Sequence, residues 1–352
     1  MELAEFIGLR PVPGAGLLVT LTRRCPLSCA HCSTSSTTAG EEPGAADLSR
    51  FIGSFTAEDR PSVLLLTGGE PLLLPGLVRE LATSARAAGS RTVLLSGMFF
   101  ARDGRISPPI LRAIESADHF SASLDAQHER EVPRQGVFRA LRRVLDLGVP
   151  VSVHLTGTGP RDPYLAEATA AIRREFDDRV PMLVNEIRAV GRAASWATAT
   201  AQRADGSRAT PCAMAAWPVV AFDGAVLACC NQRVVDRRPA PPHLLLGHIA
   251  HDDWPTVLRR SLSSPMLRMI RAVGPAHLHD RYAFEPTESG YCDGCRNLSA
   301  RPGVVAGAAR DASGVVGELL DREAARMQTE AGPVALLRRY GCEPYADYVA
   351  LS

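Results

Sequence analysis

The spacing of three cysteines near the amino terminus constrains this chain more than any other feature of its sequence. Cys25, Cys29 and Cys32 follow one another as C-x3-C-x2-C, directly after an apolar, alternating segment. A tight loop leaving a strand can turn three thiolates toward one point, one ligand fewer than a 4Fe-4S cluster or a tetrahedral zinc ion requires. The pattern therefore predicts either a metal centre with an open position or a zinc site that His31 or a distant residue completes.

A second motif follows a buried strand. Residues 63–67, Val-Leu-Leu-Leu-Thr, are an apolar run typical of such a strand, and the run is followed by Gly68, Gly69, Glu70 and Pro71. Two glycines allow the backbone to approach a ligand closely, Glu70 offers an acceptor for an ammonium group, and Pro71 fixes the exit of the turn. These residues indicate a ligand at the end of the strand.

In this order and distance, the two motifs resemble those of the radical S-adenosylmethionine (SAM) enzymes. The resemblance implies that Cys25, Cys29 and Cys32 hold a 4Fe-4S cluster whose open iron binds SAM. It also implies that the Gly-Gly-Glu-Pro segment holds the SAM amine. The residue before the third cysteine is usually aromatic in that family, whereas here it is His31. The resemblance places this position beside the cluster and not among its ligands.

The remaining pattern of the first half predicts an α/β fold. Further strands are expected at residues 92–96, 120–124, 149–155 and 182–187, with helical stretches between them, for example at 77–88 and 138–147. Strand followed by helix, repeated, implies parallel strands joined by right-handed crossovers. The resemblance implies a partial (β/α)6 TIM-like barrel, in which ligands lie at the carboxyl ends of the strands.

Further residues of this half match the family. Ser123 and Asp125 share one face of the fourth predicted strand and resemble the pair that contacts the SAM ribose and methionyl groups. Asp125 also suits a turn that ends a strand. The resemblance places Val190, in Val-Gly-Arg-Ala, beside the adenine and pairs Arg134 with the SAM carboxylate, the alternative for Arg134 being a solvated surface arginine.

A second group of cysteines occurs later in the chain. Residues 219–227 are expected to form a hairpin with an Asp-Gly turn, which would bring Cys212 and Cys229 side by side. With Cys292 and Cys295 of a C-x2-C pair they make four thiolates. This arrangement resembles the auxiliary-cluster modules called SPASM and twitch, which implies a second, auxiliary 4Fe-4S cluster. Structural zinc is the alternative, because four thiolates also suit that ion.

Two cysteines are left over. Cys230 adjoins a predicted ligand and could pack in the interior, replace Cys229 as a ligand, or donate a hydrogen atom to a substrate radical. Cys342 lies outside any periodic stretch. It could be inert, or it could donate a hydrogen atom to a substrate radical. Both are candidate catalytic residues.

Composition restricts the remaining choices. The 352 residues carry a net charge of +1, which gives no electrostatic footprint for nucleic acid, and no apolar run is long enough to span a membrane. All 39 basic residues counted as Lys+Arg are arginines, so lysine Schiff-base chemistry is excluded. Nine cysteines without a signal peptide predict a cytoplasmic protein whose thiols bind metal.

We expect a radical SAM core over residues 1–193, an auxiliary-cluster domain over 194–300 and a helical tail over 301–352. The tail is predicted to be helical from 315 to 339, with Leu319, Leu320 and Met327 packed against the barrel.

The resemblance implies an oxidoreductase or epimerase that acts on a natural-product intermediate, either a small molecule or a peptide. It also implies a flavodoxin- or ferredoxin-type electron donor. A maturase of ribosomal peptides and a non-catalytic iron-sulfur or zinc protein remain alternatives.

Overall fold

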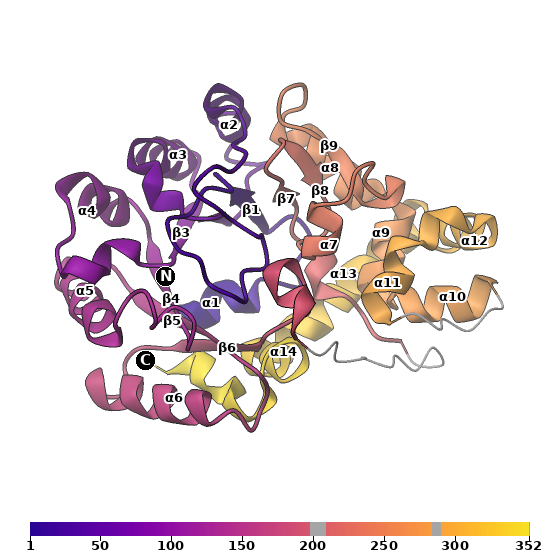
Figure 1. The fold of residues 1–352 in the computed structure, drawn as a ribbon. Coiled ribbons are helices and arrows are strands. Elements are labelled where there is room, and N and C mark those ends of the chain that lie inside the picture. The colour runs from indigo at the N-terminus through magenta and orange to yellow at the C-terminus, as the bar shows by residue number, and fades with distance from the viewer. Residues whose placement is uncertain (198–208, 284–289, 352) are drawn as a thin grey trace.

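A curved sheet of nine strands organises the computed structural model, which describes residues 1–197, 209–283 and 290–351 (Figure 1). The strands lie in the order β6-β5-β4-β3-β2-β1-β7-β8-β9. All neighbours from β6 to β7 are parallel, whereas β7-β8 and β8-β9 are antiparallel. Their bounds are β1 Gly16–Thr20, β2 Val63–Thr67, β3 Arg91–Ser96, β4 His119–Leu124, β5 Val151–Gly157, β6 Met182–Glu186, β7 Val219–Val220, β8 Ala225–Leu227 and β9 Leu245–His248.

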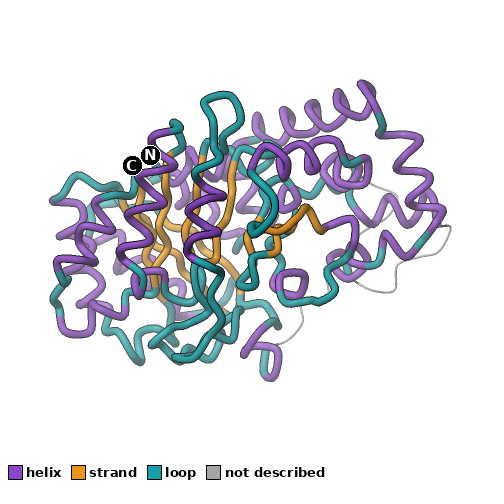
Figure 2. Tube along the Cα trace, turned by 90° about the horizontal axis from the view of Figure 1, so that it is seen from above, coloured by secondary structure: helices purple, strands orange, loops and turns teal. Residues whose placement is uncertain are grey.

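Helices join the parallel strands and cover the outer side of the sheet (Figures 1 and 2). Those of the first half are α1 Leu3–Gly8, α2 Ala45–Ile52, η1 Pro71–Leu73, α3 Pro75–Ala87, η2 Phe99–Asp103, α4 Pro108–Glu115, α5 Arg134–Asp146, α6 Pro163–Glu175 and η3 Gly191–Ser195. Their buried faces are apolar at helical spacing, as in α3 with Val78, Leu81 and Ala85. This packing produces the expected α/β fold with a parallel, barrel-like sheet.

The second half adds helices beside the antiparallel strands, and its last two helical elements return to pack against α1 and β6. The helical elements of this half are η4 Ala213–Ala215, α7 Gln232–Val235, η5 Pro242–Leu244, α8 Trp254–Ser263, α9 Pro265–Ala272, α10 Pro275–Ala283, α11 Tyr291–Arg296, η6 Leu298–Ala300, α12 Pro302–Ala312, α13 Gly314–Glu330, α14 Gly332–Tyr340 and η7 Glu343–Ala350. The Asp-Gly hairpin predicted at 219–227 is present as β7 and β8. Because β7 pairs with β1, the sheet continues across the boundary expected at residues 193 and 194.

The carboxyl-terminal tail differs from the prediction. The expected single helix is broken between α13 and α14, where Gly332 adopts a positive φ of 81°. Leu319 and Met327 were expected to pack against the barrel, but they are 53% and 61% exposed. The buried face of α13 consists of Gly317, Asp321 and Ala325, because an ion pair holds this helix to α9. Leu320 is also exposed, so the predicted packing stripe is wrong.

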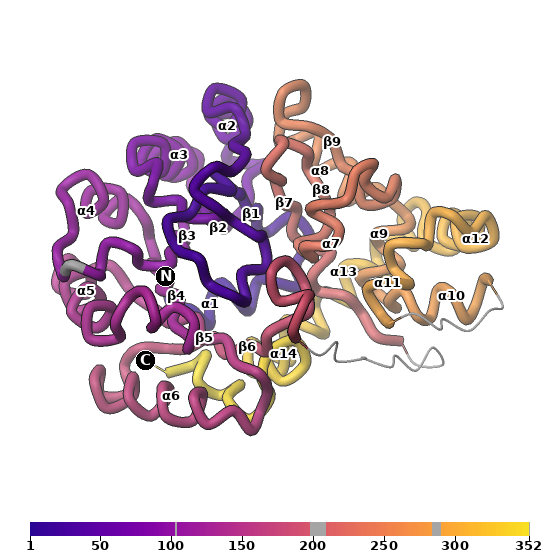
Figure 3. Tube along the Cα trace, in the orientation of Figure 1, coloured from indigo at the N-terminus to yellow at the C-terminus, as the bar shows by residue number. Residues whose placement is uncertain are grey.

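The loops that connect the carboxyl ends of the strands gather at one end of the sheet, the lower edge in Figure 2. The segment between β1 and α2, which holds the first three cysteines, crosses in front of these ends (Figure 3). Among the described residues, none of the helices has the length and apolar character needed to cross a membrane.

Candidate functional site

The three amino-terminal cysteines lie in one cavity at the carboxyl ends of the strands. Cys25 and Cys29 are buried, and Cys32 is partly exposed. The backbone N–H of Leu27 donates to the Cys25 thiol at 3.4 Å, and the Cys32 thiol lies 3.3 Å from the Thr34 hydroxyl. Burial raises the pKa of Cys25 to about 12, and the neighbouring thiolates raise it further. The predicted convergence of the three thiols is therefore consistent with the structure.

The cavity has a volume of about 480 Å³ and contains both polar and apolar walls. Five consecutive strands β2 to β6 contribute residues at or just beyond their carboxyl ends. These include Gly68, Gly69, Ser96, Gly97, Ser123, Asp125, His154, Thr156, Asn185, Glu186, Arg188 and Val190. The predicted contacts Gly68, Gly69, Ser123, Asp125 and Val190 are thus at the cavity.

The two glycines are required by the cysteine loop itself. Gly68 has a φ of +142°, and a side chain there would lie 2.5 Å from the Thr22 carbonyl oxygen. A side chain on Gly69 would collide with the Arg24 carbonyl oxygen. The Gly69 and Glu70 backbones donate to the Thr22 and Arg24 carbonyls at 2.5 and 2.8 Å. The glycines thus allow the cysteine loop to lie against the end of β2.

Glu70 does not have the position that the resemblance implied. Its side chain is fully buried and accepts hydrogen bonds from Ser96 Oγ at 3.0 Å and from the backbones of Leu72 and Gly97 at 3.0 and 2.9 Å. Burial raises its pKa to about 7. Glu70 and Pro71 are not among the cavity residues. The carboxylate ties the end of β2 to the end of β3, which leaves it enclosed by donors of its own chain.

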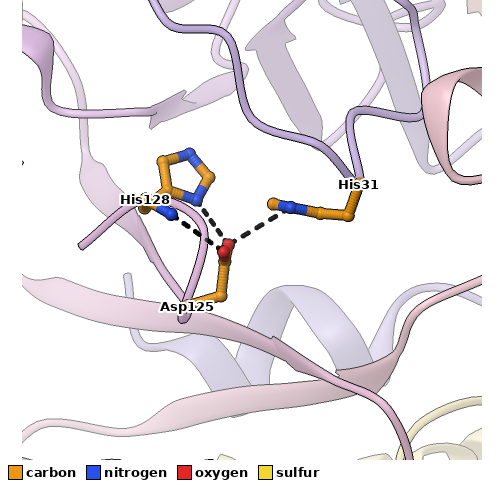
Figure 4. A group of neighbouring side chains, drawn as sticks. All are labelled: His31, Asp125 and His128. Carbon is orange, nitrogen blue, oxygen red and sulfur yellow. Dashed lines mark hydrogen bonds and ion pairs between the residues drawn. The ribbon is translucent and has the colours of Figure 1, made fainter. Parts of the chain in front are cut away.

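Asp125 likewise binds its own chain (Figure 4). Its Oδ1 accepts from the backbones of Gln127 and His128 at 2.8 and 3.0 Å, which is the turn that ends β4. Its Oδ2 accepts from His31 Nε2 at 3.2 Å and from His128 Nδ1. The turn agrees with the strand-ending role that the sequence allowed for Asp125, whereas the two histidine donors were not predicted. Both imidazoles reach the carboxylate from different segments, so they join the cysteine loop to the loop after β4.

The charges of this group affect one another strongly. Burial alone would lower the pKa of His128, but its interactions with Asp125 and Cys29 raise that pKa to about 10. The pKa of Asp125 is lowered well below its usual range, because the two histidines outweigh the opposing effect of burial. The carboxylate is therefore held in its ionised form.

Arg134 does not reach the cavity. It makes ion pairs with Glu129 and Glu167 at 2.5 and 2.6 Å and stacks over Tyr164. The Nε and Nη1 of Arg134 bond to these two carboxylates, and Arg134 is not among the residues that line the cavity. The Arg134 side chain is 17% exposed, so it also differs from the solvated surface arginine of the alternative.

Arg192 has a role at the cysteine loop that the sequence did not reveal. Its side chain donates to the carbonyls of Cys29 and Ser36 at 2.8 and 2.5 Å, and its backbone donates to the Cys32 carbonyl at 3.0 Å. Gly191 makes this approach possible with a φ of +56°, since a side chain there would collide with the Cys32 carbonyl. The Gly-Arg pair after β6 therefore fixes the loop from the side opposite to β4.

Electrostatic effects link the cysteines of the second group. Burial raises the pKa values of Cys212, Cys229, Cys292 and Cys295, and for each of Cys212, Cys229 and Cys295 at least one of the other three thiolates raises it further. Such mutual effects require short separations. Cys212 precedes η4, Cys229 follows β8, and Cys292 and Cys295 lie in α11. The four thiols are thus available to one metal centre.

Two buried histidines hold the C-x2-C turn. Nε2 of His243 lies 3.0 Å from the Cys295 carbonyl oxygen, and Nε2 of His279 lies 2.9 Å from that of Gly294. Since a carbonyl oxygen only accepts, each Nε2 carries the hydrogen. Sequence inspection gave no signal for these contacts, because the histidines are distant from α11 in the chain.

Cys230 and its neighbour Cys229 face different surroundings. Cys230 lines the cavity that contains Cys25, Cys29 and Cys32, whereas Cys229 is grouped with Cys212 and Cys295. Cys230 also raises the pKa of Cys229, ahead of Cys212 and Cys295, so it adjoins the second group as well as the cavity. Cys342 is fully buried in the hydrophobic core and is not among the cavity residues, so the structure does not support its proposed hydrogen-atom donation.

The chemistry of the first donor set fits a 4Fe-4S cluster with one open iron. Three thiols share the cavity, and the remaining space is lined by polar groups that can receive a ligand of the fourth iron. A zinc ion would need a fourth ligand, and Nδ1 of His31, which is buried without a hydrogen-bond partner among the described residues, could supply it. The second donor set has four thiols, which fits a closed cluster or zinc.

Comparison with known proteins shows what this chain is similar to. Residues 19–171, which include the three amino-terminal cysteines, match the family model described as the radical SAM superfamily. A curated relative, PqqA peptide cyclase of Gluconobacter oxydans (strain 621H), is 28% identical over 158 residues. The match covers 41% of this chain and 42% of the relative, so the chain spans less than half the length of that protein.

Solved structures support the same fold. Streptococcus suis SuiB bound to its precursor peptide SuiA has a TM-score of 0.53 and 12% identity, with 81% of this chain and 76% of SuiB covered. The anSMEcpe structure with bound AdoMet and Cp18Cys peptide has a TM-score of 0.51 and 12% identity, with coverage of 84% and 98%. At this identity, the likeness establishes the fold alone.

Proposed function

We propose that this protein is a radical SAM enzyme that abstracts a hydrogen atom from a natural-product intermediate and then oxidises or epimerises the resulting radical. The observation that carries the proposal is the shared cavity of Cys25, Cys29 and Cys32, with the radical SAM family match over the same region. When bound, the cluster and SAM would supply a 5′-deoxyadenosyl radical.

In this proposal, Cys25, Cys29 and Cys32 hold the cluster, and the wall formed by Gly68, Gly69, Ser123 and Val190 receives SAM. Arg192 fixes the ligand loop by its bonds to the Cys29 and Ser36 carbonyls. The cavity that would hold the cluster and SAM is lined by apolar as well as polar groups. A soluble electron donor of the flavodoxin or ferredoxin type would provide the electron, and a cytoplasmic location would suit such a donor.

Two outcomes for the substrate radical are supported by different cysteines. Cys212, Cys229, Cys292 and Cys295 would hold an auxiliary 4Fe-4S cluster able to accept an electron, which favours oxidation. Cys230, in the cavity, would return a hydrogen atom to the substrate radical, which favours epimerisation. A reduced donor would then restore the Cys230 thiol with one electron and one proton.

For the substrate, a peptide is favoured over a sugar or aminocyclitol. The curated relative is named as a peptide cyclase, and the SuiB and anSMEcpe structures contain peptides. A ribosomal-peptide maturase is therefore the preferred form of this proposal. A small-molecule substrate remains the second candidate, and a non-catalytic iron-sulfur or zinc protein is the alternative of a different class.

The first experiment is anaerobic reconstitution followed by iron analysis, electron paramagnetic resonance and assay of 5′-deoxyadenosine with SAM and dithionite. We expect about eight irons per chain, falling to about four in a C25A/C29A/C32A variant, and a signal that changes with SAM only in the unaltered protein. We also expect 5′-deoxyadenosine from the unaltered protein alone. One zinc per chain, no iron and no 5′-deoxyadenosine would overturn the proposal.

A further inference from the structure

The loop that carries the cluster cysteines is fixed to the segment after β4 by side chains that the family pattern does not supply. His31, between Cys29 and Cys32, and His128, after β4, both donate to the same oxygen of Asp125 (Figure 4). Ser28 of the cysteine loop donates to Glu131 of the same segment at 2.6 Å through its backbone. We propose that Asp125, His31 and His128 form a clamp that positions the cysteine loop, and that His128 tunes the reduction potential of the cluster.

The proposal depends on the assignment of a cluster to Cys25, Cys29 and Cys32. Within that assignment, Asp125 is a positioning residue, because it acts on the cluster only through the two histidines. Its carboxylate is 2% exposed and accepts from four donors, all within the chain. A carboxylate in this state has no strong acceptor position left for a ribose hydroxyl, so its function is internal.

His31 explains why the aromatic residue usual at this position can be replaced. An aromatic hydrocarbon ring would fill similar space beside the cluster but would not bond to Asp125. The rings of His31 and His128 meet edge to face with centroids 5.5 Å apart, so the clamp is packed as well as hydrogen-bonded. Loss of either ring would therefore release the cysteine loop from the end of β4.

His128 also reaches the cluster side of the loop. Its side chain lines the same cavity as Cys29, one of the proposed ligands, while Asp125 holds its Nδ1. Hydrogen bonds to ligand sulfurs are among the factors that set iron-sulfur potentials. A bond from His128 to the Cys29 sulfur would stabilise the more negative, reduced cluster. Removing it should make the cluster harder to reduce.

The same three side chains could in principle serve a different purpose. His31, Asp125 and His128 each offer one ligand atom, and these atoms lie within 4.8 Å of one another. Two histidines and a carboxylate suit several divalent metals. In the clamp, hydrogen bonds occupy the same atoms, so metal binding and the clamp exclude each other and can be distinguished by experiment.

The test uses the full chain, reconstituted anaerobically, with four variants. H31F restores an aromatic ring without a donor, D125N removes the charge and one acceptor, and H128N retains an amide that can donate to Asp125 but cannot reach Cys29. R134Q is the matched control in the same segment, since Arg134 pairs only with Glu129 and Glu167 and touches no cysteine. Readouts are iron content, the SAM-responsive resonance signal, and the midpoint potential.

We expect H31F and D125N to lose at least half of the SAM-responsive signal, while R134Q matches the unaltered protein. H128N should keep its iron but lower the midpoint potential, with at least a tenfold smaller equilibrium constant for reduction by a fixed donor, or about 59 mV for one electron. Melting of the apo chains checks folding, and if D125N fails to fold, H31F and H128N still test the proposal.

Unaltered signals and potentials in all three clamp variants would overturn the inference. So would one equivalent of a divalent metal in the C25A/C29A/C32A variant that D125N abolishes, because this would identify a metal site. If the unaltered protein itself acquires no iron, the proposed function fails instead, and that result is distinct from the outcomes above.

Discussion

Arg10 Nη2 donates a hydrogen bond to the thiol of Cys230 across 3.2 Å. The same nitrogen lies 3.4 Å from the Met214 carbonyl oxygen, and the guanidinium stacks 4.9 Å above the Trp217 ring. These contacts fix the arginine, which is far from Cys230 in sequence. Because Arg10 occupies a lone pair of the sulfur, the S–H hydrogen remains free to point into the cavity.

The hydrogen bond from Arg10 to Cys230 predicts that hydrogen donation by Cys230 can be detected without substrate. With SAM and dithionite in D2O, the S–D group should deliver deuterium to the 5′-deoxyadenosyl radical and give deuterated 5′-deoxyadenosine. The reductant then restores the thiolate with a second electron. Mass spectrometry of the nucleoside measures this deuterium. We expect C230A to lose at least nine tenths of it at unchanged iron content, which is about a tenfold effect on the transfer.

Two controls separate this expectation from general damage. C342A, which alters a core thiol outside the cavity, should keep the deuterium. C229A should lose about four irons, because Cys229 belongs to the second group. Undiminished deuterium in C230A would remove Cys230 from the mechanism, although the formation of 5′-deoxyadenosine would still support the radical function.

Local sequence patterns predicted the parts of this site that depend on neighbouring residues. The apolar run at 63–67 is β2, the Asp-Gly hairpin is present, and the first three cysteines line one cavity. Each of these features is encoded within a few residues or by a metal-ligand spacing. The order of strand and helix then places the motifs at one end of the sheet.

Sequence could not predict which partners satisfy the polar side chains. Glu70 and Asp125 were expected to contact SAM, but their oxygens accept from Ser96, His31 and His128. A buried carboxylate takes whichever donors the packed chain supplies, and these come from distant segments. The same limit hid Arg10 and Arg192, whose bonds span more than a hundred residues. For the carboxyl-terminal tail, the periodicity of the sequence identified the helix but not which of its faces is buried.

The ion pair between Arg271 and Asp321 should be essential for stability. It is bidentate, at 2.8 and 2.6 Å, and both residues are at most 5% exposed. D321N keeps the shape but leaves the guanidinium charge buried without its partner, which should cost about 3 to 5 kcal/mol in the free energy of unfolding. Urea denaturation measures the loss.

The control for this pair is E318Q on the same helix. Glu318 forms an exposed i,i+4 pair with Arg322, so its loss should change stability by less than about 0.5 kcal/mol. A D321N chain as stable as E318Q would show that the buried pair contributes no more than a surface one.

His119 should make stability depend on pH. It is fully buried, with Nδ1 2.9 Å from the Met1 carbonyl oxygen and Nε2 2.7 Å from Ser152 Oγ, and burial lowers its pKa to about 4. The unfolded chain, with a pKa near 6.5, binds more protons between pH 6.5 and 4, so stability from this group is complete above 6.5 and falls as pH falls.

The expected contribution is about 3 kcal/mol across that window. H119Q should be less stable at pH 7 but should lose less additional stability on acidification, as judged by urea midpoints between pH 7 and 4.5. Parallel curves for the two proteins would mean that His119 does not titrate in this range.

His243 should hold the second metal centre without contacting it. Its Nε2 donates to the Cys295 carbonyl at 3.0 Å, and burial lowers its pKa to about 4, which keeps the ring neutral at pH 7. H243A frees the last turn of α11 and should remove most of the second metal, about four irons if it is a cluster. The SAM-responsive signal should persist, since the first three cysteines are held by other residues.

H251A, which changes an exposed histidine, is the control. Equal metal content in both variants would show that the Cys292 and Cys295 turn is stable without His243.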